Sequence, residues 1–333
     1  MTNSLRRPVI ATDSDTVAGA LTALIGAGSW PRPPLVRQVG AGSLAAPPGE
    51  EAILAVPTTS ALLTARAAHD RLYVVDETGD TAGSVRRLVD LVTNARRVTP
   101  SRAEYGMHAA YGAALRSAAW RGGVGAALTD DRGDVVALGT AEVPAYGGGQ
   151  YWEGDPGDAR DIRLAGDPAT AVRLATVETL LDLLAAGGVS LPGPAATVAA
   201  DLLAAFDKQQ GSHGVGHGGA AAQTFESLGR VVHAEMAALL TAARNRLDIG
   251  GSTMYVTASS CRQCLRHLVC AGLRQIVYFG PRLDSAPPFH ADSVDVRADA
   301  PGRLRLTPFT GVGPGAYQAL FGAQMREFSV ARI

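Results

Sequence analysis

Lysine is almost absent from this chain of 333 residues. Lys208 is the only lysine, so apart from histidine every other basic side chain is arginine. A Walker-type ATPase needs a lysine in its phosphate-binding loop, and a pyridoxal-phosphate enzyme needs one for its Schiff base. The segment around Lys208, AAFDKQQGS, fits neither pattern. Both classes of enzyme are therefore excluded.

The chain also lacks a charge excess, a disulfide framework and a long apolar run. A net charge of −1 leaves no basic surplus of the kind that nucleic-acid binding usually needs. No run approaches the length of a membrane span, and no signal-peptide pattern opens the sequence, so we expect a soluble cytoplasmic protein without a membrane partner. Of three cysteines, Cys261 and Cys264 form a C-x-x-C pair, which in a reducing compartment indicates metal or redox chemistry.

The length suggests two domains, and the first alternates strand-like with helical segments. This alternation predicts a small doubly wound α/β domain with a parallel sheet over residues 1–98. The turn after the first strand, ATDSDTVAG, has no glycine-rich loop, so a scaffolding or dimerisation role is favoured over nucleotide binding. The alternating segments are 8–12, 16–28, 52–56, 59–70, 72–77 and 84–97.

The second domain is predicted to cover residues 99–333. Ser101 and Glu104 form a possible capping box before a helix, and VGAALTD and DVVALGT follow as a predicted hairpin. The stretch 144–163 is too rich in glycine and aspartate for regular structure, which makes it a candidate flap. A helix is predicted from about Pro168 to Ala186.

One set of residues predicts a metal centre. His233 opens a helical stretch, and Cys261 and Cys264 open a second helix after the strand TMYVTA. One imidazole and two thiolates can then converge on one Zn²⁺, and three protein ligands leave a fourth position open for water, as in catalytic zinc sites. Cys270 lies near the far end of the second helix, where it is poorly placed to close the site as a fourth ligand.

Glu235 is the expected acid–base residue of this centre. It lies two residues after His233, within reach of a water molecule at the metal but not itself a ligand. Zinc lowers the pKa of such a water towards neutrality, and Glu235 can carry its proton to a ring nitrogen and then to departing ammonia. H-x-E followed by C-x-x-C is the signature of zinc nucleobase deaminases. Either motif alone is weak evidence for such an enzyme, whereas the two motifs in the order helix, strand, helix, strand are a specific signature.

On these residues the second domain resembles the cytidine and deoxycytidylate deaminase superfamily, most closely the deaminase half of bacterial anti-phage deoxycytidine-nucleotide deaminases. The segments TPSRAEYGM, EVPAYGGGQYWEGD, GRVVHAEM, AGLRQIVYFGP and PFTGVGPGAY also carry the likeness. The resemblance implies a three-layer α/β/α fold with a mixed sheet, His233, Cys261 and Cys264 as zinc ligands, and Glu235 as proton shuttle. It also implies a P-loop kinase-like first domain, which in this chain is degenerate because its phosphate loop is missing.

The departures from the family pattern concern the substrate. The family's G-x-N, whose asparagine binds the sugar and the pyrimidine, is here Gly139-Thr140-Ala141, and the usual proline before the first cysteine is Ser260. Alanine cannot supply the hydrogen bonds of asparagine. Because unpaired polar groups are costly, this loss predicts weak use of ordinary deoxycytidine nucleotides or a changed substrate.

Several further residues are expected to border the substrate. The guanidinium group of arginine can bind a phosphate or a carboxylate through two parallel hydrogen bonds. Arg160 and Arg163, like Arg116 and Arg121, could equally form ion pairs at the surface. Aromatic rings in the candidate flap could stack on a heterocycle or simply pack the loop. His267 is expected in the core or near the ligands. The expected substrate-binding residues are Arg116, Arg121, Ala141, Tyr151, Trp152, Ala234, Ser260 and His290.

These observations predict a zinc-dependent hydrolytic deaminase of a cytosine-type nucleotide or a related amino-heterocycle, with phage defence as one role. Tailoring of a specialised metabolite is the alternative role, because of Ala141. The alternative from a different functional class is a non-catalytic protein that binds a nucleotide or acts as a scaffold. The presence of Glu235 argues against this alternative, because a protein that only binds needs no proton shuttle. A polynucleotide deaminase ranks last, since no basic channel is evident. The apolar helix near 100–119 suits burial between subunits, so a homo-oligomer is expected.

Overall fold

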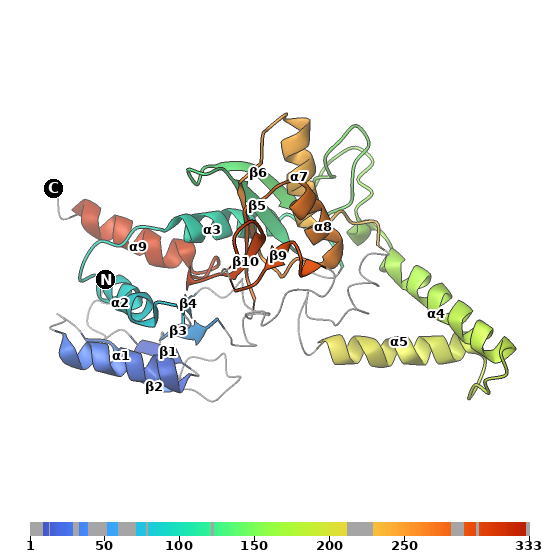
Figure 1. Cartoon of the computed structure of the whole chain (residues 1–333), viewed down its shortest axis with the longest axis horizontal. Coiled ribbons are helices and arrows are strands. Elements are labelled where there is room, and N and C mark those ends of the chain that lie inside the picture. Colours follow the sequence, from blue (N-terminus) through green and yellow to red (C-terminus); the bar gives the residue numbers. More distant parts are fainter. Residues whose placement is uncertain are drawn as a thin grey trace.

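The computed structural model describes most of the chain as two β-sheets with flanking helices (Figure 1). The described residues are 9–12, 14–28, 33–38, 52–58, 71–77, 79–120, 123–211, 229–280, 290–297 and 300–330. Among them, no helix is long and apolar enough to cross a membrane.

The first sheet has the strand order β11-β4-β3-β1-β2. Four of its strands are parallel, and β11 joins the edge antiparallel to β4. Parallel strands buried on both faces form continuous apolar runs, as in β4, where all four residues of LYVV are buried. The strands are β1 (Val9–Thr12), β2 (Leu35–Gln38), β3 (Ala52–Pro57), β4 (Leu72–Val75) and β11 (Gly311–Val312).

Alternation along these strands divides the first sheet between two cores. Ile10, Ile53 and Tyr73 face a core built with helices α1 (Asp15–Ala27), α2 (Thr81–Thr93) and α9 (Tyr317–Val330). Their sequence neighbours face the second sheet and α3 (Arg102–Ala114) instead. The predicted α/β class with a parallel sheet is confirmed. The second sheet and α3 therefore cover the other face of the first sheet.

The strand β11 and the helix α9 come from the C-terminal end of the chain. Val312, Ala316 and Phe321 belong to the same core as α1 and α2. The proposed division of the chain at residues 98 and 99 stays a prediction, and residues 311–330 complete the first sheet from the far end of the sequence. The strand β2, with the sequence LVRQ, is not among the predicted segments, and the predicted helix at 59–70 lies outside the described residues.

The second sheet is mixed, with the order β6-β5-β7-β8-β10-β9. β5 pairs antiparallel with β6, which confirms the predicted hairpin, and also antiparallel with β7. β7, β8, β10 and β9 are parallel. Helices α7 and α8 cover one face and α3 the other, which confirms the predicted three layers. The elements are β5 (Gly125–Thr129), β6 (Val135–Thr140), β7 (Thr253–Val256), β8 (Gln275–Tyr278), β9 (Val294–Asp295), β10 (Leu304–Pro308), α7 (Ala234–Arg244) and α8 (Arg262–Cys270).

Two local features fix the position of α3. The predicted capping box is present, with Ser101 Oγ accepting from the Glu104 amide and the Glu104 carboxylate accepting from the Ser101 amide. That fully buried carboxylate also pairs with Arg87 of α2 and accepts from the Val312 amide of β11. Glu104 therefore connects α3 both to α2 and to β11, which are far apart in the sequence.

Two further helices form a hairpin that extends away from the sheets (Figure 1). They are α4, which spans Pro168–Ala186 as predicted, and α5 (Ala195–Gly211). The stretch 144–163 before them is irregular, as expected, apart from one turn of 3₁₀ helix at Asp161–Arg163.

Candidate metal centre

The three predicted metal ligands meet in the structure. The Nδ1 atom of His233 lies 3.4 Å from the Cys261 sulfur and 3.5 Å from the Cys264 sulfur. All three ligand atoms lie within 4.8 Å of one another. Zinc bonds of about 2.0–2.3 Å at tetrahedral angles give ligand separations of roughly 3.5 Å, so the donor set and its spacing fit Zn²⁺. Among the described residues, these three form the only such cluster of His, Cys, Asp and Glu.

Helix ends bring these ligands together. His233 is the N-cap of α7, and Cys261 is the N-cap of α8, where its sulfur accepts from the Cys264 amide. The N-terminus of a helix carries partial positive charge, which favours a thiolate over a thiol. β7 ends just before Cys261, so the strand order and the two helix starts place the centre at the carboxyl end of that strand.

The two cysteines differ in acidity. Their mutual hydrogen bond is the largest influence, and it lowers the pKa of the Cys261 thiol and raises that of Cys264. His233 lowers the pKa of Cys261 further. Cys261 is thus the first of the pair to become a thiolate. A bound divalent cation displaces the remaining thiol proton, because thiolates are the metal-binding form.

Glycine at position 139 lets α7 approach the sheet closely. A Cβ atom there would lie 2.0 Å from the Ala234 carbonyl oxygen and 2.3 Å from the Ala238 amide nitrogen. Gly125 on β5 plays the same part for α3, with 1.9 Å to the Ala110 carbonyl oxygen. The glycine of the G-x-N position thus serves packing, and it sets the depth of the helix that begins at the metal ligand.

Glu235 is buried beside the cluster without being part of it. Burial, followed by the neighbouring Cys261 sulfur, raises the pKa of the Glu235 carboxyl, and His233 partly offsets this. The Ser260 hydroxyl also lowers the pKa of Glu235, although the oxygen is buried without a hydrogen bond of good geometry. This is the position expected of a residue that exchanges protons at the centre.

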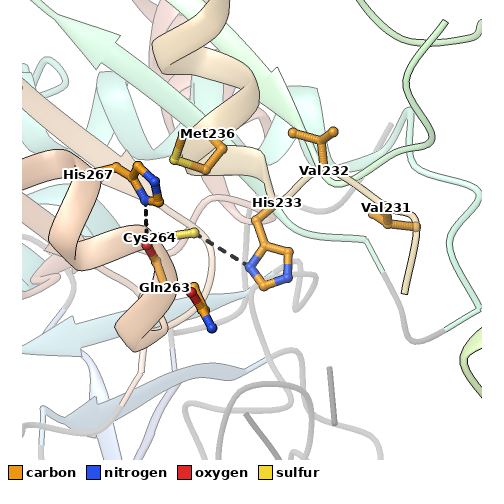
Figure 2. A pocket seen from close by; sticks show the side chains of 7 residues that line it. All are labelled: Val231, Val232, His233, Met236, Gln263, Cys264 and His267. Atoms are coloured by element: carbon orange, nitrogen blue, oxygen red, sulfur yellow. Dashed lines mark hydrogen bonds between the residues drawn. The ribbon is translucent and has the colours of Figure 1, made fainter. Parts of the chain in front are cut away.

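A cavity of about 290 Å³ opens next to two of the ligands (Figure 2). Figure 2 shows the His233 ring turned towards the Cys264 sulfur, with His267 and Gln263 projecting from α8 beside them. Of the two alternatives for His267, the position near the ligands is the one that the structure shows, because its side chain is exposed and lines this cavity, and its Nδ1 contacts the Gln263 carbonyl. The lining residues are Val231, Val232, His233, Met236, Gln263, Cys264 and His267.

Gln263 and Met236 are cavity residues that our sequence reasoning missed. Each follows directly from a predicted motif, since Gln263 is the second variable residue of C-x-x-C and Met236 follows the glutamate of H-x-E. The signal was therefore present in the spacing. Met236 lies three residues after His233, and Gln263 lies four residues before His267, and residues three or four apart lie on the same side of a helix.

Glu142 positions the segment that leads into His233. Its carboxylate is fully buried and accepts from the amides of Ala118 at 2.7 Å and Val143 at 2.8 Å. Its backbone pairs in both directions with Val232, next to the metal ligand. No sequence pattern that we considered indicated this role, because it depends on a tertiary bridge between distant segments.

The expected substrate residues separate into two places. Ala141 and Ala234 are buried in one cluster with Cys261 and Cys264, close to the centre. Arg116 and Trp152 instead line a second cavity, of about 670 Å³, along the edge strand β6. The two cavities share no lining residue. Contact of these residues with a substrate stays a prediction.

The arginines near the expected flap are engaged within the protein. The Arg116 guanidinium stacks over the Trp152 ring at 3.8 Å and donates to the Tyr151 carbonyl oxygen at 3.1 Å. Arg160 is buried and pairs with Asp158 and Glu153, which Arg163 also contacts. The ion-pair alternative therefore describes Arg160 and Arg163, and these contacts hold the loop in place.

Two expected residues are not placed at the centre. Arg121 lies outside the described residues. His290 precedes β9, at the end where the parallel strands begin and at the opposite edge of the sheet from β6. The metal ligands, by contrast, follow the end of β7. A role for His290 stays a prediction.

A family model described as the cytidine and deoxycytidylate deaminase zinc-binding region matches residues 100–280. The match covers just over half of the 333 residues. The chain belongs to this family. Zn²⁺ is accordingly its cofactor, and His233, Cys261 and Cys264 fit the ion as ligands.

Individual relatives match this chain over shorter stretches. Deoxycytidylate deaminases of the Enterobacteria phages T2 and T4 are each 47% identical over 47 residues, which is 14% of this chain. The match spans about a quarter of those relatives' length, 25% and 24%. Among solved structures, the apo dCMP deaminase from the cyanophage S-TIM5 aligns at 15% identity with a TM-score of 0.31, over 63% of this chain and 100% of that chain.

Proposed function

We propose that this member of the family is a zinc-dependent hydrolytic deaminase acting on a cytosine-type nucleotide. The observation that carries the proposal is Glu235, a buried carboxyl beside three metal-ligand side chains but outside their cluster. A structural zinc site has four protein ligands and no need of an adjacent acid, whereas three ligands and a free carboxyl suit hydrolysis.

Metal binding and proton transfer are assigned to different residues of the chain. His233, Cys261 and Cys264 would hold the ion, which when bound activates a water molecule as a nucleophile at neutral pH. Glu235 accepts a proton from that water and passes protons to the pyrimidine ring nitrogen and to the amine. Overall the bond between carbon and the exocyclic amine breaks, a bond between carbon and oxygen forms, and ammonia leaves.

Burial of the centre supports this chemistry. Cys264 and Glu235 are 1% and 4% exposed, so charges in the site are poorly screened by water. The hydroxyl of Ser260 is a spare donor beside Glu235, where relatives are expected to have proline. It can donate to the carboxylate when that group has given up its proton.

The direct test is a substrate panel with the purified, zinc-loaded chain. We expect one zinc per chain, and ammonia release from at least one of cytidine, deoxycytidine and their mono- and triphosphates. Adenine nucleotides and single-stranded oligonucleotide serve as comparison substrates. Zinc-loaded protein that is inert towards every cytosine compound would contradict the proposed substrate class.

A changed substrate is the second candidate, favoured by Ala141. This residue is buried close to Cys261, and its carbonyl accepts from Ser117 Oγ at 2.6 Å, which fixes the backbone there. Its methyl group offers no hydrogen bond to a sugar or a base. An enzyme that tailors a specialised metabolite would need no asparagine at this point.

The substitution Ala141→Asn separates the two candidates. If a deoxycytidine nucleotide is the substrate, the new amide supplies one or two hydrogen bonds worth about 1 kcal/mol each, so kcat/KM is expected to rise about 5- to 30-fold. Ala141→Val, of similar added bulk but apolar, is the control and should not raise it. A fall in kcat/KM in both variants, with zinc content unchanged, would contradict binding of a deoxycytidine nucleotide next to residue 141.

A role in phage defence follows from the same activity by family resemblance. Removal of the amine from deoxycytidine nucleotides would deplete the pool that a phage needs for replication. In infected cells we expect the pool of deoxycytidine nucleotides to fall when the chain is expressed. Unchanged pools, with an active purified enzyme, would favour a biosynthetic role.

A further inference from the structure

Among the described residues, little holds the hairpin of α4 and α5 in place within one chain. The two helices pack on each other and on no other helix or strand to a comparable extent. Few of their apolar side chains are buried, among them Ala169 and Leu181 of α4 and Leu203 of α5, and an Arg173–Asp207 ion pair joins the two helices at 2.6 Å. Isolated helices of this length are marginal in water and normally depend on tertiary packing.

Large apolar side chains on this hairpin are exposed. On α4, Val172, Leu180 and Leu183 are 45%, 56% and 66% exposed. At 100° per residue these three lie within one stripe, roughly a quarter of the way around the helix. On α5, Leu202 is 51% exposed. Large apolar side chains exposed along one side of a hairpin indicate an interaction site.

The α4 stripe and Leu202 of α5 lie on the same side of the hairpin. Viewed from the N-terminus of α4, Leu180 and Leu183 lie about 100° and about 160° anticlockwise from the buried Leu181. Viewed from the N-terminus of α5, Leu202 lies about 100° anticlockwise from the buried Leu203. Because a hairpin makes its two helices antiparallel, rotations of the same sense in these two views point to one side, which therefore carries exposed leucines of both helices.

The charges of the hairpin favour a protein over a lipid surface. Glu178 and Asp182 lie towards the side of α4 away from the stripe. Lys208 and Arg173 are the only cations of the two helices, and Arg173 is paired with Asp207. Helices that lie on membranes carry many basic residues on their polar face, so this acidic hairpin does not fit that class.

The size of the face suits a dimer. The 19 residues of α4 give a length of about 28 Å, and two helices side by side are about 20 Å wide, so the flat footprint is roughly 560 Å². Protruding side chains add to this, and stable interfaces bury about 600–1,000 Å² per partner. Two antiparallel helices with one apolar face are half of an antiparallel four-helix bundle, and the face has no charge that would repel its own copy.

We propose that two copies of this chain associate through their α4–α5 hairpins, face to face, as a four-helix bundle. The pairing is isologous, so Leu180, Leu183 and Leu202 of one copy enter the same interface as those of the other. The assembly places the two metal centres on opposite sides of the bundle, because each hairpin extends away from its own sheets (Figure 1). This proposal is independent of the substrate.

The test is the mass of the full chain in solution by sedimentation velocity and light scattering at about 10 μM. We expect twice the chain mass of 34.3 kDa for the natural sequence and a single-chain mass for Leu180→Glu/Leu183→Glu. Leu240→Glu is the matched control, because Leu240 is also 51% exposed but lies on α7, and it should remain dimeric. Circular dichroism and zinc content verify that each variant is folded.

A milder variant keeps the test valid if the Leu180→Glu/Leu183→Glu protein does not fold. Leu183→Ala keeps a good helix former and should raise the dissociation constant at least tenfold in a dilution series. A natural chain that sediments at 34.3 kDa would overturn the proposal. So would a folded Leu180→Glu/Leu183→Glu protein that stays dimeric, since another surface would then hold the copies together.

Discussion

Replacing Glu235 by glutamine is expected to lower kcat/KM by about 10²- to 10⁴-fold, the usual contribution of a positioned acid–base group. Glutamine has the same shape but cannot carry a proton between water and the substrate. The metal ligands are untouched, so zinc content should stay at one per chain. Ammonia release from the best substrate of the panel, together with metal analysis, measures both quantities.

Glu104→Gln is the matched control for this experiment. Glu104 is also a fully buried carboxylate, but it caps α3 and pairs with Arg87, far from the metal ligands in the fold. Its substitution should lower the free energy of unfolding and leave turnover at low temperature unchanged. If Glu235→Gln retained full turnover, the proton-shuttle role would be wrong. If it lost turnover yet kept its biological effect, the protein would act by binding a nucleotide.

The second large effect is expected from Gly139→Ala. One added methyl group would meet the backbone of α7 at 2.0 Å, and backbone cannot move aside as a flexible side chain can. The helix must shift, and His233 at its start must move relative to Cys261 and Cys264. We expect the free energy of unfolding to fall by about 3 kcal/mol and zinc binding to weaken, because ligand geometry tolerates little displacement.

Gly112→Ala provides the comparison. Gly112 is in the interior of α3, and a Cβ atom there has nothing within 4 Å. Alanine favours helix over glycine by about 1 kcal/mol, so this variant should be as stable as the natural chain or more so. Denaturant unfolding and zinc titration of both variants decide the matter. Equal stability of Gly139→Ala and the natural chain would show that α7 can be repositioned without cost.

The metal centre could be predicted from the sequence because its geometry is local. His233 and Cys261 both begin helices, and helix starts are marked by spacing and by the strands before them. Two motifs in the correct order then suffice. Glu235 could be predicted for the same reason, since only Ala234 separates it from the ligand His233.

The surroundings of the centre could not be predicted in the same way. Arg116 stacks on Trp152 and Arg160 pairs with Asp158, and nothing in the sequence distinguishes such internal partners from a bound phosphate. Both outcomes use the same guanidinium chemistry. The choice depends on how the loop folds back, which is a property of the tertiary structure.

Two strands of the first sheet, β2 and β11, also could not be predicted from the sequence. Strand β2 is four residues long and contains Arg37 and Gln38, so it lacks an apolar pattern. β11 has only two residues, Gly311 and Val312. Their pairing is specified by neighbours far away in the sequence, and local propensity carries little information about such contacts.

The return of the C-terminal end to the first sheet has a consequence for synthesis on the ribosome. Domains usually fold in the order in which they emerge, the N-terminal one first. Here the core around Val17 and Leu88 needs Val312 and Phe321, which are made after all three metal ligands. The ligands have all emerged with Cys264, while the first sheet still waits for its edge strand. A sheet whose first strands precede the metal ligands in the chain is therefore completed only after those ligands have been made.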